Sequence, residues 1–384
     1  MDTGKKRDIQ TGQKKMHVLH VIASLEFGGG TQVVFDLMNG MKDSVESSVL
    51  VCVDGENQKF LKAGFSVQTS NNSIAHYVAS VRREAVKGNW DVIHFHGTRA
   101  AFFGRIALCF INKRPKIVYT LHGFHIPHYA FLKRGLLLCV ENVLNHFVDC
   151  LVCVSDSDKN QVKKFHLIQN DKIHVITNGI DLARVPSQTF QEKTQKRTSM
   201  GIPSDGVVLV TACRLKEPKN VSVILRALKR VADELPLYLW VLGDGPRRAD
   251  LERETKDLGL HDRVSYFGQS TSVLDFVLAA DIAILSSRWE GLPLFLLEAS
   301  ACQKPLLGSH VDGIVDVIVD GKTGFLFEEN NEEDLSQRLR MLTRDVSKRE
   351  SFGVAAFQHV HEVFDLKKTI DAYENLYRDL INKK

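Results

Sequence analysis

The 384-residue sequence contains no apolar run of about 18 residues, the length that a membrane-spanning helix requires. Its first residues also lack the apolar core of a secretory signal peptide. With 44% hydrophobic and 25% charged residues, the composition is typical of a globular protein. We therefore expect a cytoplasmic protein that at most touches the inner face of the cell membrane as a peripheral protein.

The sequence also lacks a disulfide framework, because its seven cysteines are odd in number and irregularly spaced. Its single Cys-x-x-Cys pair, Cys150 and Cys153, lies in an apolar run typical of a buried strand. Side chains three residues apart on a strand face opposite sides. This spacing argues against a zinc or redox site and favours buried cysteines in a reducing compartment.

A broad excess of positive charge is absent as well. Most of the net charge of +4 lies in residues 1–15, which hold five Lys or Arg against two Asp. We interpret this stretch as a disordered basic leader. The nearly neutral remainder does not favour a nucleic-acid partner.

Short apolar runs alternate with helical patterns along the rest of the chain, which predicts α/β domains with parallel sheets covered on both faces. The alternation stops in a polar stretch near residues 182–205 and then restarts. We therefore expect two doubly wound domains, over 16–185 and 186–366. A helix over 367–384 follows, and in one arrangement this helix crosses back to the N-terminal domain. The expected strands lie within 16–25, 47–55, 90–97, 116–123, 150–155 and 172–179, then 207–215, 237–245, 263–269, 282–289 and 304–313.

Glycine-rich loops follow several of these strands, where ligands of parallel sheets bind. The first, "EFGGGTQ", lets a phosphate approach the backbone at Gly29 and Gly30, although a plain tight turn is an equal interpretation. It matches neither the dinucleotide fingerprint nor the phosphate loop that ends in Gly-Lys-Ser/Thr. That mismatch disfavours a nicotinamide-dependent oxidoreductase.

Two cations follow the first strand of the second domain, Arg214 and Lys219 in "CRLKEPKN". At the end of a strand they can neutralise a diphosphate and stabilise it as a leaving group. A solvated basic loop is the alternative.

Two carboxylates, Glu290 and Glu298, flank the apolar stretch "GLPLFLL". Pro293 fits the first turn of a helix, which would leave the amides of Leu294 and Phe295 for an anion. Glu298 lies one turn further on, where a ribose diol would satisfy it. A carboxylate bonded by protein groups alone is the competing account.

This Glu-x7-Glu stretch resembles the signature of glycosyltransferase family 4, whose members are retaining enzymes of GT-B fold. The resemblance extends over nearly the whole chain from Met16. It rests on the order of the two glutamates with further motifs: Gly28-Gly29-Gly30, His122-Gly123, Asn178-Gly179-Ile180-Asp181, Arg214 with Lys219, Gly243-Asp244-Gly245-Pro246 and Gly321-x-Thr323-Gly324-Phe325.

The resemblance implies a fold in which two Rossmann-like domains face each other across a cleft. It implies that Arg214 and Lys219 bind the donor diphosphate, Glu298 the ribose and Glu290 the transferred sugar. His122 would lie near the hydroxymethyl group of that sugar. The catalytic set is then Glu290, His122, Arg214 and Lys219. The donor site adds Gly29, Gly30, Gly243, Gly268 near the base, Leu294, Phe295 and Glu298.

On the acceptor side we expect His96 and His125. His94 and His96 share one face of a strand, but no third ligand is evident, so we predict no metal site. The following segment, "HIPHYAFLKRGLLLCVENVL", is similar to the acceptor side of enzymes that build capsule or other surface polysaccharides. A core helix is the first interpretation of its pattern, and weak contact with a membrane surface is the second.

The implied function is retaining transfer of a sugar from a nucleotide-diphosphate donor, with UDP favoured, to a saccharide or lipid-linked acceptor. No cofactor or metal is expected. One alternative is a silent homologue that binds sugar nucleotides without turnover. Another is a metal-dependent GT-A enzyme that uses Asp156 and Asp158, the Asp-x-Asp pair after an apolar strand.

Overall fold

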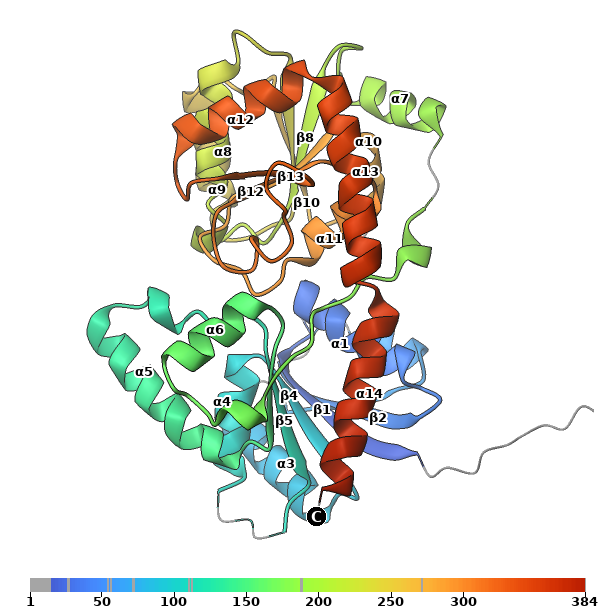
Figure 1. The fold of residues 1–384 in the computed structure, drawn as a ribbon, viewed down its shortest axis with the longest axis vertical. Coiled ribbons are helices and arrows are strands. Elements are labelled where there is room, and N and C mark those ends of the chain that lie inside the picture. The colour runs from blue at the N-terminus through green and yellow to red at the C-terminus, as the bar shows by residue number, and fades with distance from the viewer. Residues whose placement is uncertain are drawn as a thin grey trace, which may run out of the picture.

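The computed structural model describes residues 15–25, 28–53, 55, 57–70, 73–109, 111, 113–186, 189–270 and 272–383. Apart from Lys15, the predicted basic leader lies outside these ranges. The described chain forms two α/β domains, one above the other in Figure 1. Each is built around its own parallel sheet with helices on both faces.

The N-terminal domain contains a seven-stranded parallel sheet in the order β3-β2-β1-β4-β5-β6-β7. The strand order reverses between β1 and β4, which is where ligands bind in doubly wound folds. Its strands are β1 (Met16–Ser24), β2 (Val45–Val53), β3 (Ser66–Thr69), β4 (Val92–His96), β5 (Lys116–Leu121), β6 (Cys150–Cys153) and β7 (Ile173–Val175). Its helices are α1 (Gly29–Gly40), α2 (Asn57–Lys62), α3 (Ile74–Lys87), α4 (Thr98–Ala107), α5 (Phe131–Leu144) and α6 (Asp156–Lys164).

The C-terminal domain repeats this plan with a six-stranded parallel sheet, in the order β10-β9-β8-β11-β12-β13. Its strands are β8 (Val207–Ala212), β9 (Leu237–Leu242), β10 (Val264–Gly268), β11 (Ile282–Leu285), β12 (Leu306–Ser309) and β13 (Gly324–Phe327). Its helices are α7 (Phe190–Ser199), α8 (Val221–Val231), α9 (Arg248–Asp257), α10 (Val273–Ala279), α11 (Leu294–Ala301), α12 (Glu332–Arg344) and α13 (Val346–Val363). Short 3-10 turns lie at Ile126–His128, Asn145–Phe147, Asn170–Lys172, Leu182–Arg184 and Glu217–Lys219.

The predicted fold class is confirmed, since both sheets are parallel and doubly wound. The short edge strands β3 and β13 were not among the expected strands. Cys150 and Cys153 lie in two different core clusters on opposite faces of the sheet. Burial raises the pKa of the Cys150 thiol to about 12, as expected of a cysteine that packs rather than reacts.

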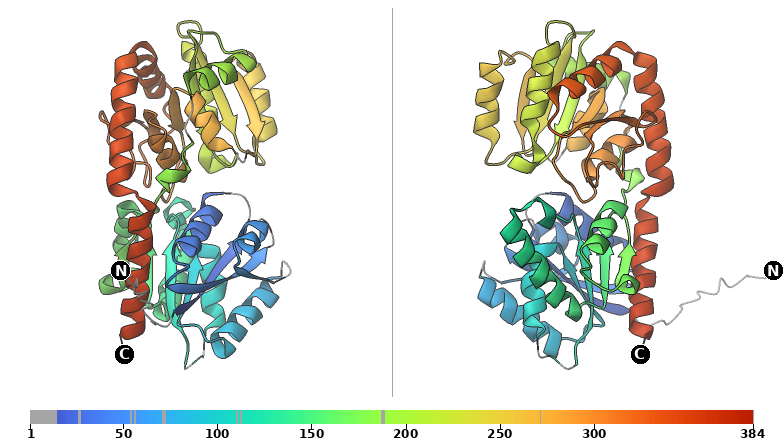
Figure 2. Two further views of the ribbon diagram at one scale, coloured as in Figure 1. Left: turned by 90° about the vertical axis from the view of Figure 1, so that its right-hand side faces the viewer. Right: turned by 60° about the vertical axis from the view of Figure 1, so that its left-hand side comes forward.

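The chain crosses twice between the domains. After α13 it turns into α14 (Leu366–Asn382), which lies along the N-terminal domain (Figure 2). There Tyr373, Leu376 and Tyr377 pack in the same core cluster as β1, β4 and β5. The outgoing linker meets this return at Ile180, whose amide donates to the carbonyl of Phe364. Gly179 permits the crossing, because a Cβ there would lie 2.4 Å from the Cα of Leu366.

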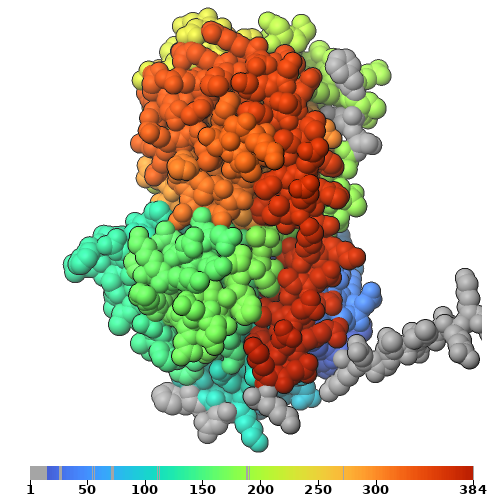
Figure 3. All heavy atoms as spheres, in the orientation of Figure 1, coloured from blue at the N-terminus to red at the C-terminus, as the bar shows by residue number. Residues whose placement is uncertain are grey.

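The expectation of a core helix after residue 130 is wrong. Helix α5 buries Glu141 and Leu144 in its last turn, whereas Phe131 and Leu132 are 77% and 84% exposed. In Figure 3 this teal segment projects from one side of the molecule. The anchoring contact is a buried ion pair, in which Arg105 of α4 donates to both carboxylate oxygens of Glu141. No helix in the described ranges combines the length and apolarity needed to cross a membrane.

Candidate active site

A cavity of about 490 Å³ lies between the two domains, beyond the carboxyl ends of their strands. Loops from both domains contribute to its wall. The predicted site residues in its lining are Gly29, Gly30, His122, Arg214, Lys219, Gly243, Glu290, Leu294, Phe295 and Glu298. The structure therefore brings these ten residues, which the chain places up to 269 positions apart, to one cleft.

The first glutamate of the motif is held by two donors. Lys219 Nζ lies 2.5 Å from Glu290 Oε1, and the Ser287 hydroxyl donates to the same oxygen at 2.6 Å. Burial acts to lower the pKa of Lys219, but the Glu290 carboxylate outweighs it and the net pKa is raised. Lys219 is thus a stable cation, and Oε2 is the oxygen of Glu290 left for a hydroxyl of a ligand.

The second glutamate is in a different environment. Glu298 lies in the second turn of α11, and in the described chain no donor bonds to its carboxylate. Burial, and to a smaller extent repulsion from Asp36 of α1, raises the pKa of Glu298 to about 7. Two hydroxyl donors from a ligand would favour its ionised form.

The N-terminus of α11 faces the same cleft and no side chain caps it. Pro293 is the residue before the helix, with φ −76° and ψ 109°, so the prediction that it occupies the first turn is wrong. The helix nevertheless begins at Leu294. The amides of its first turn therefore remain in place for an anion.

Two glycines allow the domains to touch beside the cleft. A Cβ on Gly291 would lie 2.6 Å from the amide nitrogen of Gly123, so both backbones must approach closely. Nearby, the Trp289 ring stacks on His128 of the other domain, with centroids 4.3 Å apart. The sequence analysis missed Trp289, although it directly precedes the motif glutamate.

His122 lies at the end of β5, next to this contact. Burial lowers its pKa to about 4, so at neutral pH the ring is an uncharged hydrogen-bonding group. Its Nε2 lies 3.4 Å from Nδ1 of His96. The remaining ring nitrogen, Nδ1, is the one available to a ligand in the cleft.

A second cavity of about 420 Å³ adjoins the first and includes both predicted acceptor-side residues, His96 and His125. The N-terminus of α4 also lines it, without a side-chain cap or an acidic residue in its first turn. Arg99 in that turn was missed by the sequence analysis. None of the described residues that line this pocket is acidic.

Gly268 does not line the cleft. Its carbonyl accepts from the amide of Gly243, and the next two residues, Gln269 and Ser270, form the wall instead. The turn after β10 is therefore at the cleft, as predicted, but through two residues that the sequence analysis did not single out.

The Asp-x-Asp pair has a supporting place behind the cleft rather than a place in its wall. Asp158 is buried and accepts from the amide of Phe124 at 2.8 Å, which fixes the loop that carries His122. Burial is the main reason that the pKa of Asp158 rises to about 8, so its carboxyl is largely protonated at neutral pH. Neither Asp156 nor Asp158 lines the cleft, and the GT-A alternative is wrong for this fold.

A third potential ligand for His94 and His96, which was not evident in the sequence, is present in the structure. His20 of β1 pairs directly with His94 across the sheet, and one ring nitrogen from each of the three lies within 4.8 Å of the others. Sequence spacing could not reveal this, because residue 20 is 74 positions away on another strand.

Two family models match consecutive parts of the chain. The model described as Glycosyltransferase Family 4 covers residues 27–184, and that described as Glycosyl transferases group 1 covers residues 192–359.

Several known proteins are similar over most of their length. An N-acetyl-alpha-D-glucosaminyl L-malate synthase from Bacillus anthracis is 29% identical, over 77% of each chain. A UDP-Gal:alpha-D-GlcNAc-diphosphoundecaprenol alpha-1,3-galactosyltransferase from Escherichia coli is 27% identical, over 78% of each chain. The crystal structure of Anabaena Alr3699/HepE in complex with UDP and glucose superposes with a TM-score of 0.83 at 18% identity, over 95% of this chain and 100% of that one.

Proposed function

Since the chain belongs to glycosyltransferase family 4 and has the GT-B fold, we propose that it transfers a hexosyl or N-acetylhexosaminyl group from a UDP-sugar to a saccharide or lipid-linked acceptor. The enzyme acts in polysaccharide or glycoconjugate biosynthesis. We further propose that the reaction retains the anomeric configuration and needs no metal ion or other cofactor.

The observation that carries this proposal is the arrangement of charge in the cleft. Arg214, Lys219 and the uncapped start of α11 line the cavity together with Glu290 and Glu298. The first three attract a diphosphate and stabilise the charge that grows when it leaves. The two carboxylates accept from hydroxyl groups. A sugar nucleotide carries both kinds of group.

The chemistry of transfer follows from the same arrangement. Glu290 is tied to Lys219 and Ser287 through one oxygen, so we assign it to holding the sugar rather than to attacking it. The leaving phosphate would then accept the proton of the acceptor hydroxyl, on the face from which it departs. His122, being uncharged, would orient the sugar by a hydrogen bond.

Names of relatives support the donor and acceptor classes. The Escherichia coli relative is named for UDP-Gal and a diphosphoundecaprenol-linked acceptor, and the Anabaena structure contains UDP. In this chain the second pocket contains Arg99 and Arg214 and no acidic residue among those described. This charge favours an acceptor that carries an anionic group, as the diphosphate of a lipid carrier does.

The proposal is tested by screening UDP-, GDP- and dTDP-sugars in the presence of EDTA. We expect UDP-sugars to raise the melting temperature and one of them to be hydrolysed or transferred without added metal. Proton NMR of the product should show the anomeric configuration of the donor. Binding without any turnover across a panel of acceptors would favour the silent homologue, and activity that EDTA abolishes would contradict metal independence.

We also propose that α5 contacts the membrane surface at the inner face of the cell membrane. Its exposed Phe131, Leu132 and Leu136 stand beside Lys133 and Arg134, and this combination suits anionic lipid headgroups.

Replacing Phe131 and Leu132 by serine should lower binding to vesicles of phosphatidylglycerol and phosphatidylethanolamine at least threefold in a flotation assay. Serine at Val346 and Val354, which are exposed on α13 of the other domain, is the matched control and should change nothing. If both double variants bound the vesicles equally well, the proposal that α5 contacts the membrane would be contradicted.

A further inference from the structure

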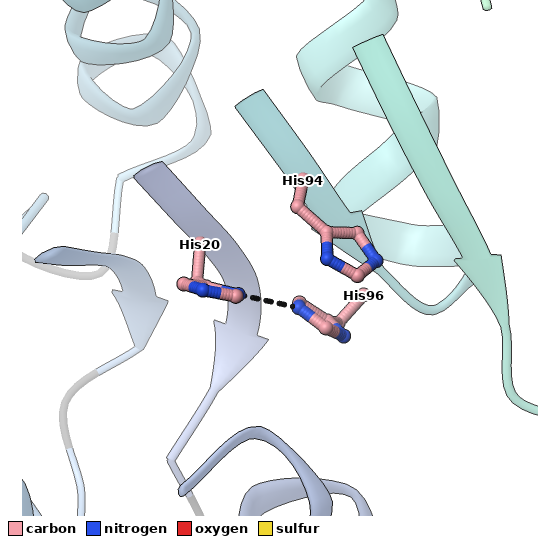
Figure 4. Close-up of side chains that lie close together, drawn as sticks. All are labelled: His20, His94 and His96. Atoms are coloured by element: carbon pink, nitrogen blue, oxygen red, sulfur yellow. Dashed lines mark hydrogen bonds between the residues drawn. The ribbon is translucent and has the colours of Figure 1, made fainter. Parts of the chain in front are cut away.

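Four histidines, on or directly after three adjacent strands, form a row that leads from the interior of the N-terminal domain to the cleft. His20 comes from β1, His94 and His96 from β4, and His122 follows β5. Figure 4 shows the first three close together, with His20 bonded to His96. His20 and His94 are fully buried, and His96 is nearly so.

A metal ion does not account for this cluster well. Both ring nitrogens of His94 are already engaged, Nδ1 by the Tyr377 hydroxyl at 2.6 Å and Nε2 by Thr120 at 2.7 Å. The facing nitrogens of His20 and His96 are 3.0 Å apart, which is a hydrogen-bond distance. The row is therefore better described as two hydrogen-bonded systems, one centred on His94 and one running from His20 through His96 to His122.

The second system is a series of hydrogen bonds in which the proton position on one ring restricts the proton position on the next. His20 Nδ1 meets His96 Nε2, and His96 Nδ1 meets His122 Nε2 at 3.4 Å. Burial lowers the pKa of all three rings, to about 3 for His20 and about 4 for His122, so each carries one ring proton at neutral pH. A neutral ring donates from one nitrogen and accepts at the other. With both bonds formed, all three protons lie on Nδ1, or all three lie on Nε2.

The far end of the chain decides between these two states. His20 Nε2 is buried and has no hydrogen-bond partner among the described residues. With protons on Nε2, an N–H group would be left unpaired there, whereas with protons on Nδ1 only a lone pair is left. Unpaired buried N–H groups are the rarer and costlier of the two.

We propose that His20 and His96 are positioning residues that fix the tautomer of His122, so that His122 presents Nδ1–H to the cleft. The ring then donates a hydrogen bond to a hydroxyl oxygen of the bound sugar. This inference rests on the proposed function only for the identity of that ligand, because the tautomers exist without it. The longer link to His122 is the one that ligand binding would tighten.

The first test uses the wild-type protein labelled with ¹⁵N-histidine. Long-range ¹H–¹⁵N correlation spectra separate the two tautomers, and single variants assign each ring. We expect Nδ1–H in His20, His96 and His122 at pH 7.5. An Nε2 proton on any of the three would overturn the proposal, as would one equivalent of zinc in the purified protein by elemental analysis. This test does not depend on activity.

The second test breaks the chain at its buried end. In His20→Leu we expect the His122 signal to shift towards a mixture of tautomers, and kcat/KM for the donor to fall about fivefold to tenfold, as for one lost hydrogen bond. The dissociation constant of UDP should stay within twofold, since His122 faces the sugar. His20→Asn, which places an amide near the position of Nδ1, should recover kcat/KM to within about threefold.

Two outcomes of the variant test would contradict a positioning role. An unchanged His122 tautomer in His20→Leu would mean that the hydrogen bonds through His96 do not fix the proton position on His122. Equal weakening of UDP and of the complete donor would mean that the variant perturbs the domain generally. If the leucine variant does not fold, the wild-type spectrum and the asparagine variant still decide whether His20 and His96 fix the tautomer of His122.

Discussion

Replacing Arg214 or Lys219 by alanine is expected to lower kcat about 100-fold or more. Both line the cleft at the end of β8, and each would stabilise negative charge that develops on the leaving diphosphate. Lys216→Ala is the matched control, because this exposed lysine lies in the same loop but does not line the cavity. Steady-state transfer assays at saturating donor give the comparison.

The Lys219 variant has a second effect that must be separated from the first. Without Lys219, the carboxylate of Glu290 keeps only the Ser287 hydroxyl as a hydrogen-bond donor among the described residues. Lys219→Arg retains the cation and should restore most of the lost activity, whereas Lys219→Gln should not. Near-normal turnover in both alanine variants would remove these residues from the leaving-group site.

Glu290→Gln and Glu298→Gln are expected to separate the two carboxylates. Glu298→Gln should weaken UDP and the complete donor alike, by about 1–3 kcal/mol, because a hydroxyl of the ribose loses its charged acceptor. Glu290→Gln should leave UDP affinity nearly intact and lower turnover, since its contact forms only with the sugar present. Calorimetry with UDP and initial rates with the donor measure both effects, with exposed Glu350→Gln as the control.

The pH dependence gives an independent check on Glu298. Its pKa of about 7 means that the carboxylate is only about half ionised at neutral pH in the free protein. UDP should therefore bind less tightly as the pH falls below about 7, by up to tenfold for each unit. The nucleotide phosphate also titrates near pH 6, so the decisive quantity is the difference between wild type and Glu298→Gln. That difference should shrink towards pH 5.5.

Other results would reverse or cancel the assignment. If Glu298→Gln binds UDP normally and Glu290→Gln does not, the two roles are exchanged. If neither variant changes affinity or rate, Glu298 is a structural carboxylate, and its pKa near 7 reflects only its burial beside Asp36.

Local patterns in the sequence predicted the architecture because parallel strands buried on both faces are continuous apolar runs. The edge strands β3 and β13 escaped notice because each has only four residues, too few for a clear apolar run, and β3 is not buried. Helix α5 was misplaced for a related reason. Its apolar residues have helical spacing, but spacing does not reveal whether another element covers them. Here the last turn is buried and Leu137 and Leu138 are partly covered, whereas the first turn is exposed.

The sequence by itself determined that two Rossmann-like domains form, and that the loops after their strands carry the glycines, cations and carboxylates of the proposed sugar-nucleotide site. These are properties of short segments, in which residue type and spacing decide conformation. Only the tertiary structure decided how the segments act on one another. It paired Lys219 with Glu290, raised the pKa of Glu298 through burial and then through Asp36, and brought His20 to His96. Strands and helices distant in sequence become neighbours only once both sheets are assembled.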